Sequence, residues 1–555
     1  MKEQIKAVLF DMGGTLRTTN MSKREVDTEK IHEMIVLLGM QVGEGELIES
    51  LQEHARAYRD WAKKNLLELN EVELWTRWML PDWPSDQVSR LALQLNQLWR
   101  AATVRHAVFP ETKDVVRTLY RRGYRLGLVS NTTSSDEVPH ILQELGISGF
   151  FDTIVLSCVV GIRKPDPSIL LMAAGQMGVQ PEHCTYIGDQ PRRDVAAARK
   201  AGFSKAIILG DQRQLESEWE DDSSLAPDHV IKNLNDLLEI FPPRPAPQPD
   251  TVYDASLSTM YAIKTFPELE EFFEFTRRTG FARIELNHKV TSAMLEGIDL
   301  SQYKFGSVHE PCPADISTDE LKKRDWLISS TNEENRREGV ISVKRSIDLA
   351  ARLGVSAIVV HAGHVSPDTG PEKKLRALIA SGRRESDEYG EIHGRMIQAR
   401  AESAEACFES VKNSIIELMA YAENTGVRLG IENRYHYMEF PSPDELEILL
   451  ALAGPDRIGF LYDTGHAQTL DILGFYRHEE WLKRFAPRII GTHLHDVIGT
   501  TDHYAPGLGK VDFETISRYL PADAFRTCEF QNFNSPEQVK AGLKFLAEYG
   551  CIKKI

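Results

Sequence analysis

Residues 7–16 read AVLFDMGGTL, an apolar run that is followed at once by Asp11 on a glycine-rich turn. Four consecutive apolar residues ahead of a turn are typical of a buried strand in a parallel sheet. Open α/β sheets present their ligand-binding groups at the carboxyl ends of the strands. The stretch therefore predicts an α/β fold in which Asp11 lies in a binding site.

Three further apolar runs in the first 240 residues, 126–130, 153–156 and 185–187, indicate more strands of the same parallel sheet. Between the first and second strands, residues 22–104 carry Leu, Ile and Trp at helical spacing. An insertion that is entirely helical, inside a pattern of alternating strands and helices, predicts a separate helical cap. We place this cap at about residues 17–105.

Polar residues follow these strands at the positions where a binding site is expected. Ser130 and Asn131 end the second strand, and Lys164 lies in GIRKPDP. Asp189 follows the fourth strand, and Asp194 comes five residues later in GDQPRRDVAAARKAG. A carboxylate that attacks an anionic phosphate needs cations beside it, and carboxylates with water suit Mg²⁺.

These motifs, in this order, resemble the haloacid-dehalogenase superfamily over about residues 5–240. The resemblance implies a Rossmann-like domain with a type-one helical cap over the active site, and a Mg²⁺-dependent phosphatase acting on a small phosphorylated substrate through an aspartyl-phosphate. The implied site residues are the nucleophile and metal ligand Asp11, the phosphate-binding residues Ser130, Asn131 and Lys164, and the further Mg²⁺ ligands Asp189 and Asp194.

One position departs from the phosphatase members of that family. Many of them carry a second aspartate two residues after the nucleophile, where it acts as general acid and base. Gly13 stands there in this chain. Losing a positioned acid typically costs about 10²–10⁴-fold in rate. We therefore expect slow cleavage of substrates with poor leaving groups.

The clearest domain boundary is PPRPAPQP at residues 242–249. Proline at this density is incompatible with a helix or a central strand and indicates a stiff, extended linker. We therefore expect a first domain at residues 1–240, a linker at 241–252 and a second domain at 253–555.

The second domain contains eight apolar runs of strand length. They are 261–264, 282–286, 305–308, 357–360, 428–431, 458–462, 489–492 and 526–528. Helical segments separate most of them, and eight such units in about 300 residues predict a (β/α)8 TIM barrel. A polar segment at residues 365–404 is expected to be an insertion after the fourth strand.

Imidazoles and carboxylates follow the predicted barrel strands from the third to the eighth. They are His309, His361, Glu432, Asp463, His466, His493 and Glu529, with His503 in a loop before the last strand. Such side chains converging on one barrel mouth are what a transition-metal site needs. Barrels of this kind bind their ligands at that end.

This pattern resembles the xylose-isomerase-like TIM-barrel superfamily, which holds sugar isomerases and epimerases and also zinc-dependent abasic-site endonucleases. The epimerase pattern implies one divalent ion, Mn²⁺, Co²⁺, Mg²⁺ or Zn²⁺. Its ligands would be Glu432, Asp463, His493 and Glu529. Of these, Glu432 and Glu529 would also be the catalytic acid and base.

The endonuclease pattern implies additional metal ions. Their ligands, or substrate-binding groups in a one-metal enzyme, would be His309, His361, His466 and His503. In the endonucleases an aspartate precedes the last of these histidines by two residues. Thr501 stands at that position here, and Asp502 is one place off.

Gross composition narrows the function classes. Hydrophobic residues make up 42% and charged residues 26%, as in soluble globular proteins. The net charge of −17 opposes non-specific binding to nucleic acid, so a nucleic-acid partner is not expected. No apolar stretch approaches the roughly 20 residues of a membrane span, the first residues lack a secretory signal, and the six scattered cysteines indicate reduced thiols. We expect a cytoplasmic protein.

Three functions remain open from the sequence. The first is a bifunctional enzyme of carbohydrate metabolism, with a phosphatase and a sugar or sugar-phosphate isomerase or epimerase. The second is a multi-zinc phosphodiesterase barrel whose monoester product the N-terminal domain cleaves. The third is a non-catalytic binding protein, which only Gly13 supports.

Overall fold

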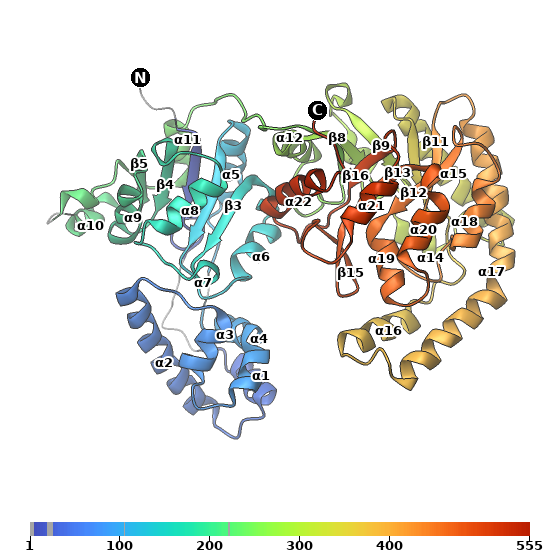
Figure 1. Cartoon of the computed structure of the whole chain (residues 1–555). Helices are drawn as coiled ribbons and strands as arrows, with labels where there is room; N and C mark the ends of the chain where they lie inside the picture. Colours follow the sequence, from blue (N-terminus) through green and yellow to red (C-terminus); the bar gives the residue numbers. More distant parts are fainter. Residues whose placement is uncertain (1–4, 19–25, 105, 220–221) are drawn as a thin grey trace. The chain divides into compact units, whose positions relative to one another are not determined.

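The computed structural model describes residues 5–18, 26–104, 106–219 and 222–555. The chain divides into two compact units, Met1–Pro247 and Gln248–Ile555 (Figure 1). In the described part of the chain, no helix is both long and apolar enough to span a membrane.

The first unit contains a parallel six-stranded sheet with the order β3-β2-β1-β4-β5-β6. Its strands are β1 (Ala7–Phe10), β2 (Arg125–Ser130), β3 (Phe151–Leu156), β4 (Cys184–Gly188), β5 (Lys205–Leu209) and β6 (His229–Ile231). The four predicted strands are present, whereas β5 and β6 were not predicted. Because β1 lies between β2 and β4, the residues that follow these three strands meet at one edge of the sheet.

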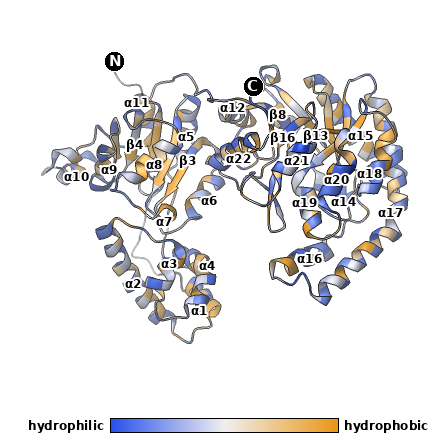
Figure 2. Ribbon diagram, in the orientation of Figure 1, coloured by the Kyte–Doolittle hydropathy of each residue, from blue (hydrophilic) through white to orange (hydrophobic). Residues whose placement is uncertain are grey.

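Helices flank this sheet and connect its strands in sequence. They are α5 (Thr112–Arg121), α6 (Glu137–Glu144), α7 (Ser157–Val160), α8 (Ser168–Gln176), α9 (Ala196–Lys200), α10 (Gln212–Leu215) and α11 (Leu237–Ile240). Figure 2 colours β3 mainly orange, and most of its residues are buried although it is an edge strand of the sheet. The Rossmann-like architecture predicted for this unit is confirmed.

The insertion after β1 is helical, as predicted. Its helices are α1 (Thr28–Leu38), α2 (Glu44–Asn65), α3 (Glu71–Leu74) and α4 (Ser85–Thr103). They enclose a hydrophobic core of their own, in which Trp75, Leu51 and Leu95 are fully buried. Residues 19–25 and 105, which include the predicted start of the helical block at position 22, lie outside the described residues.

Side chains of the cap hold the loop that follows β2. The Asn96 Nδ2 donates to the carbonyl of Thr133 at 2.8 Å, and Glu71 Oε1 accepts from the N–H of Ser135 at 2.6 Å. Both residues belong to the short loop that begins with Asn131, next to Ser130. The cap therefore rests at the edge of the sheet that carries the predicted site.

The proline-rich segment is extended, without helix or strand. Its first part packs on the first unit: the Arg244 N–H donates to the carbonyl of Arg122 at 2.9 Å, and the Tyr124 hydroxyl donates to that of Pro242 at 2.9 Å. This part of the segment is therefore anchored rather than free.

The second unit is a closed barrel of eight parallel strands, as predicted. Its strands are β7 (Tyr253–Ser258), β8 (Phe281–Leu286), β9 (Phe305–His309), β10 (Ala357–Val360), β11 (Arg428–Glu432), β12 (Ile458–Asp463), β13 (Ile489–Leu494) and β16 (Phe525–Cys528). An antiparallel hairpin of β14 (Asp496–Ile498) and β15 (Thr501–Tyr504) lies between the last two.

The first predicted barrel strand is wrong. Residues 261–264 form turns, and the strand is Tyr253–Ser258, eight residues earlier. Its sequence YDASLS mixes small and polar residues, so it lacks an apolar run. Tyr261 is buried for another reason, because its ring stacks on Phe275 at 5.6 Å and its hydroxyl donates to the carbonyl of Asn534.

Helices surround the barrel (Figure 1). They are α12 (Leu269–Thr279), α13 (Ser292–Leu295), α14 (Thr318–Lys323), α15 (Glu333–Leu353), α16 (Gly370–Ala380), α17 (Asp387–Ala422), α18 (Pro443–Leu450), α19 (Thr464–Ile472), α20 (His478–Phe485), α21 (Phe513–Tyr519) and α22 (Pro536–Glu548). The predicted polar insertion forms α16 and the first half of α17. Figure 2 shows α17 alternating between blue and orange, because one face packs inward.

Each unit has its own core, so we predict that residues 1–247 and 248–555 fold when expressed separately. Each fragment should show one cooperative thermal transition by circular dichroism. A control fragment ending at residue 204 lacks β5 and β6 and should not fold. A fragment 1–247 or 248–555 that shows no transition would contradict the prediction.

Candidate active sites

The first candidate site lies at the carboxyl ends of β1, β2 and β4. Asp11 follows β1, and its N–H donates to the carbonyl of Ile187 in β4 at 2.8 Å. Asp189 follows β4, and Asp194 lies in the π-helical turn Pro191–Val195. Oxygen atoms of Asp11, Asp189 and Asp194 lie within 4.8 Å of one another. The structure thus brings together the three predicted Mg²⁺ ligands.

Lys164, predicted to bind phosphate, is 1% exposed and points into this cluster. Its Nζ lies 2.9 Å from Asp11 Oδ1 and 3.0 Å from Asp194 Oδ1. The same ammonium donates to the Tyr186 hydroxyl at 2.5 Å, and that hydroxyl donates to the carbonyl of Val129. The positive charge is therefore held against the predicted nucleophile.

The two remaining predicted phosphate-binding residues have different surroundings. Asn131 Nδ2 donates to the carbonyl of Lys164 at 3.0 Å, and its Oδ1 accepts from the Lys164 N–H at 2.9 Å. The amide thus fixes the backbone that carries the lysine. Ser130 is the last residue of β2 and is buried.

Arg193 also belongs to this site and was not predicted. Its Nη2 lies 2.6 Å from Asp189 Oδ1 and 2.8 Å from Asp194 Oδ2, and it also contacts Asp11 Oδ2. The signal in the sequence was GDQPRRD, where two arginines lie between the acidic residues. Sequence alone could not decide which of the two turns inward; Arg192 is the exposed one.

Two glycines make room for the carboxylates. Gly14 has a φ of 77°, and a Cβ there would lie 2.1 Å from Asp189 Oδ2. A Cβ at Gly188 would lie 2.4 Å from the Asp194 carboxylate. Burial raises the pKa of Asp189 to about 6, although Arg193 acts in the opposite direction. Three oxygen ligands crowded in this way fit Mg²⁺, which prefers carboxylates.

The second candidate site lies at the barrel mouth. At each of seven strands, a residue whose side chain can bind a metal lies at the carboxyl end of the strand or directly after it. These residues are Glu285, His309, His361, Glu432, Asp463, His493 and Glu529. All but His361 are at most 2% exposed.

Glu432, Asp463, His493 and Glu529, the predicted metal ligands, offer atoms within 4.8 Å of one another. The His493 Nδ1 lies 2.8 Å from Glu432 Oε1 and 3.1 Å from Glu529 Oε2. Nevertheless, neither this nitrogen nor Glu432 Oε1 makes a hydrogen bond. Buried ligand atoms that converge without bonding each other fit a divalent cation.

A second group, His309, His361 and Glu432, adjoins the first. The Nε2 atoms of the two histidines are 2.6 Å apart, and that of His361 lies 3.1 Å from Glu432 Oε2. Burial lowers the pKa of His361 to about 3, which keeps the ring in its neutral, ligand-competent form. Glu432 belongs to both groups and can therefore bridge two ions.

Glu285 was missed by sequence reasoning. Its Oε2 lies 3.1 Å from His493 Nε2, on the side of the ring away from Glu432. A metal-binding histidine usually donates its other N–H to a carboxylate in this way. The signal was an acidic residue near the end of the second predicted strand, in the stretch ARIEL, which also contains Arg283.

Comparison with known proteins gives the families of both units. Residues 5–202 match the family model of haloacid dehalogenase-like hydrolases, and residues 307–549 match that of xylose isomerase-like TIM barrels. The chain therefore contains a haloacid dehalogenase-like hydrolase domain followed by a xylose isomerase-like TIM barrel.

Known relatives align with about half of the chain. A glyceraldehyde 3-phosphate phosphatase of Methanopyrus kandleri is 29% identical over 42% of this chain and 97% of its own length. A phosphoglycolate phosphatase of Escherichia coli is 26% identical over 42% and 92%. Among solved structures, a 2-haloacid dehalogenase of Pseudomonas syringae has 24% identity and a TM-score of 0.33, covering 43% and 98%. A D-tagatose 3-epimerase-like protein has 19% identity and a TM-score of 0.38, covering 53% and 96%.

The haloacid dehalogenase-like domain has no acid two residues after Asp11. Gly13 instead forms a β-bridge with Arg17. The position therefore offers only backbone groups to a substrate, and the expectation of slow turnover on poor leaving groups stays a prediction.

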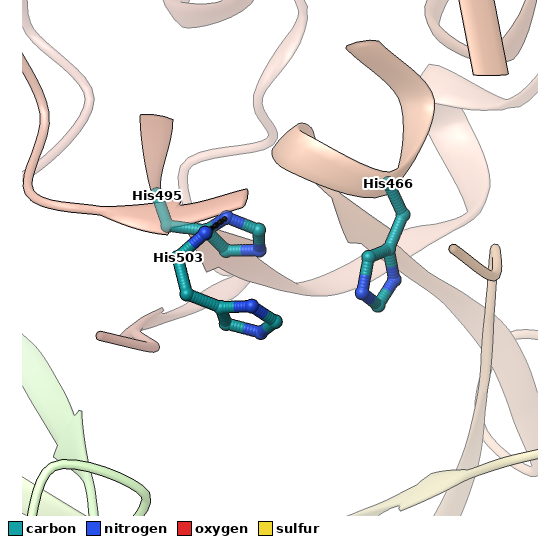
Figure 3. Close-up of side chains that lie close together, drawn as sticks. All are labelled: His466, His495 and His503. Atoms are coloured by element: carbon teal, nitrogen blue, oxygen red, sulfur yellow. Dashed lines mark hydrogen bonds between the residues drawn. The ribbon is translucent and has the colours of Figure 1, made fainter. Parts of the chain in front are cut away.

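We call the four predicted ligands Glu432, Asp463, His493 and Glu529 the metal-ligand quartet. A third group of side chains, His466, His495 and His503, lies beside it. Figure 3 shows the rings of His495 and His503 stacked in parallel, with His466 apart from them. The two stacked rings are 4.3 Å apart and inclined by 9°. His466 and His503 were predicted as possible ligands, whereas His495 was not.

The hydrogen bonds of His495 assign it a positioning role. Its Nδ1 accepts from the backbone N–H of His503 at 3.0 Å. The proton of the neutral ring therefore sits on Nε2, which donates to Asp463 Oδ2 at 2.9 Å. Because both nitrogens are engaged, His495 orients a metal ligand and does not offer a lone pair of its own.

Asp502 reaches the group despite its shift by one position. Its Oδ1 lies 2.9 Å from His503 Nδ1, and its Oδ2 lies 3.5 Å from His466 Nε2 without any hydrogen bond. His503 has a φ of 62°, a left-handed turn within the hairpin. A further ion held by His466 and His503 stays a prediction, and Asp502 lies close enough to both to contribute to it.

A cavity opens next to His361 at the barrel mouth. Its polar lining includes Lys322, His364, Arg434 and Glu439. Arg434 pairs with both Glu432 and Glu439, so the cavity connects directly to the metal-ligand quartet.

If His495 positions Asp463, His495→Phe should weaken divalent-metal binding to the barrel about 10–100-fold without lowering the number of ions bound at saturation. His495→Gln, which keeps a donor, should retain more of the affinity. Metal analysis with titration calorimetry measures both quantities. Loss of a whole ion in both variants would instead identify His495 as a ligand.

Proposed function

We propose that this chain is a bifunctional enzyme of small-molecule, carbohydrate-type metabolism. The haloacid dehalogenase-like domain hydrolyses a small phosphomonoester with Mg²⁺, and the barrel isomerises or epimerises a sugar or sugar phosphate with a divalent ion. The observation that carries the barrel half is the quartet of Glu432, Asp463, His493 and Glu529. Similarity to phosphatases of small phosphorylated compounds supports the first half.

In the first site, Asp11 is the nucleophile. An oxygen of its carboxylate forms a bond to phosphorus while the bond from phosphorus to the ester oxygen breaks. Water then attacks the same phosphorus, which releases phosphate and restores the carboxylate. Lys164, 2.9 Å from Asp11 Oδ1, offsets negative charge as the phosphate approaches. A Mg²⁺ held by Asp11, Asp189 and Asp194 supplies further positive charge when bound.

In the barrel, Glu432 and Glu529 come from different strands, β11 and β16. Both carboxylates approach one nitrogen, His493 Nδ1, at 2.8 and 3.1 Å. One can remove a proton from the carbon beside a carbonyl, and the other can return it, which inverts that carbon. A divalent ion on the quartet supplies Lewis acidity to the carbonyl oxygen.

A multi-zinc phosphodiesterase is the alternative for the barrel. The observation that favours it is the second group, in which His309 and His361 share Glu432 with the quartet. The N-terminal domain would then cleave the phosphomonoester product.

Asp11→Asn should lower phosphate release from small phosphomonoesters at least about a thousandfold, because an amide is not a nucleophile. Wild-type protein should cleave aryl phosphates faster than alkyl phosphates, since Gly13 cannot protonate the leaving group. Asp60→Asn, on the exposed face of α2, is the control and should leave the rate unchanged. Wild-type rates in Asp11→Asn would refute the assignment.

Glu529→Gln should slow exchange of the proton next to the carbonyl of a ketose or ketose phosphate in D₂O by about 10²–10⁴-fold, with Mn²⁺ present. NMR measures the exchange. Glu548→Gln, which is exposed on α22, is the matched control. The alternative predicts a wild-type protein that exchanges no such proton in any sugar, carries two or more Zn²⁺ in the barrel and cleaves phosphodiesters. That result would overturn the epimerase proposal.

A further inference from the structure

Arg193 lies at the point where the three carboxylates of the first site converge. A single atom of its side chain, Nη2, lies within hydrogen-bond distance of Asp11, Asp189 and Asp194. Its Nε donates in addition to Asp194 Oδ1 at 3.0 Å. Each carboxylate therefore directs an oxygen at the same nitrogen.

Because Lys164 lies against the other oxygen of Asp11 and of Asp194, a Mg²⁺ coordinated by these residues would compete for the oxygens that face Nη2. Its bonds would be about 2.0–2.1 Å long, while Nη2 lies 2.6 and 2.8 Å from the oxygens of Asp189 and Asp194. A guanidinium and a divalent cation cannot share that space, because both are positive and would repel at such a distance.

The two cationic side chains of the site, Lys164 and Arg193, differ in their exposure to solvent. The side chain of Lys164 is 0% exposed and bonded to Tyr186, whereas that of Arg193 is 21% exposed. Arg193 can therefore swing towards solvent while Lys164 stays in place. Its neighbour Arg192 is already exposed on the same turn.

We propose that Arg193 is a built-in counter-ion that Mg²⁺ must displace, so that it sets the Mg²⁺ concentration at which the haloacid dehalogenase-like domain becomes active. This inference rests on the proposed Mg²⁺-dependent phosphatase. Without Mg²⁺, Arg193 and Lys164 together offset most of the negative charge of the three carboxylates; with Mg²⁺, the Arg193 guanidinium is released to the mouth of the site.

The test compares Arg193→Gln with Arg192→Gln in the full chain, by calorimetric titration with MgCl₂ after removal of metals. Asp189→Asn lacks a ligand of the first site, so its titration gives the heat that belongs to the barrel. Arg193→Gln should bind Mg²⁺ at the first site at least about tenfold more tightly than wild type, because a competing charge is gone. Arg192→Gln should bind as wild type does.

A second measurement does not depend on Mg²⁺ affinity. In EDTA, Arg193→Gln should melt a few degrees below wild type, because its carboxylates are left uncompensated, and added Mg²⁺ should restore it. If Arg193→Gln does not fold, Arg193→Lys, which keeps one charge without the planar fork, should show tighter Mg²⁺ binding to a smaller degree.

The outcomes separate this inference from the function on which it rests. Equal or weaker Mg²⁺ binding in Arg193→Gln overturns the counter-ion role while the phosphatase proposal stands. If no variant binds more Mg²⁺ than Asp189→Asn, the proposed Mg²⁺ site itself is wrong, and the inference is overturned with it.

Discussion

Carboxylates buried at the carboxyl ends of parallel strands are the constraint on which both sites depend. Removing such a group from water costs several kcal/mol unless a cation stands beside it. Glu285, Glu432, Asp463 and Glu529 are at most 1% exposed in the barrel. A fold that gathers so many anions in one place is stable only if positive charge is gathered with them.

The two domains meet this constraint by different means. The first site contains Lys164 and Arg193, so the chain itself balances most of the charge of its three carboxylates. In the barrel, burial keeps His361 neutral, and Arg434 supplies a single cation against Glu432. Although burial acts in the opposite direction, Glu529 and Glu285 raise the pKa of His493 well above its usual range, and Asp502 does the same for His503. These two rings therefore supply positive charge beside the carboxylates, whereas a bound metal ion would need them neutral.

Much of this arrangement follows from the sequence, because parallel strands bring the residues that follow them to one edge. That rule is sufficient to assemble Glu432, Asp463, His493 and Glu529 from four separate segments. It fails where a strand lacks an apolar run, as in β7, or where a residue's role depends on the direction of its side chain. Glu285, Arg193 and His495 act by contacting another functional residue, and spacing does not reveal such contacts.

The number of ions in the barrel is linked to the charge of the group that they bind. Against its four buried carboxylates stand Arg434 and the ions, since the histidine ligands must be neutral to bind metal. With one divalent ion, these carboxylates and Arg434 keep a net negative charge, which favours the neutral carbonyl and hydroxyl oxygens of a sugar over a phosphodiester anion. Each further divalent ion adds two positive charges and makes the site more favourable to a phosphodiester. If the barrel binds its ions as proposed, His309 and His361, together with His466 and His503, are the residues that decide between these substrates.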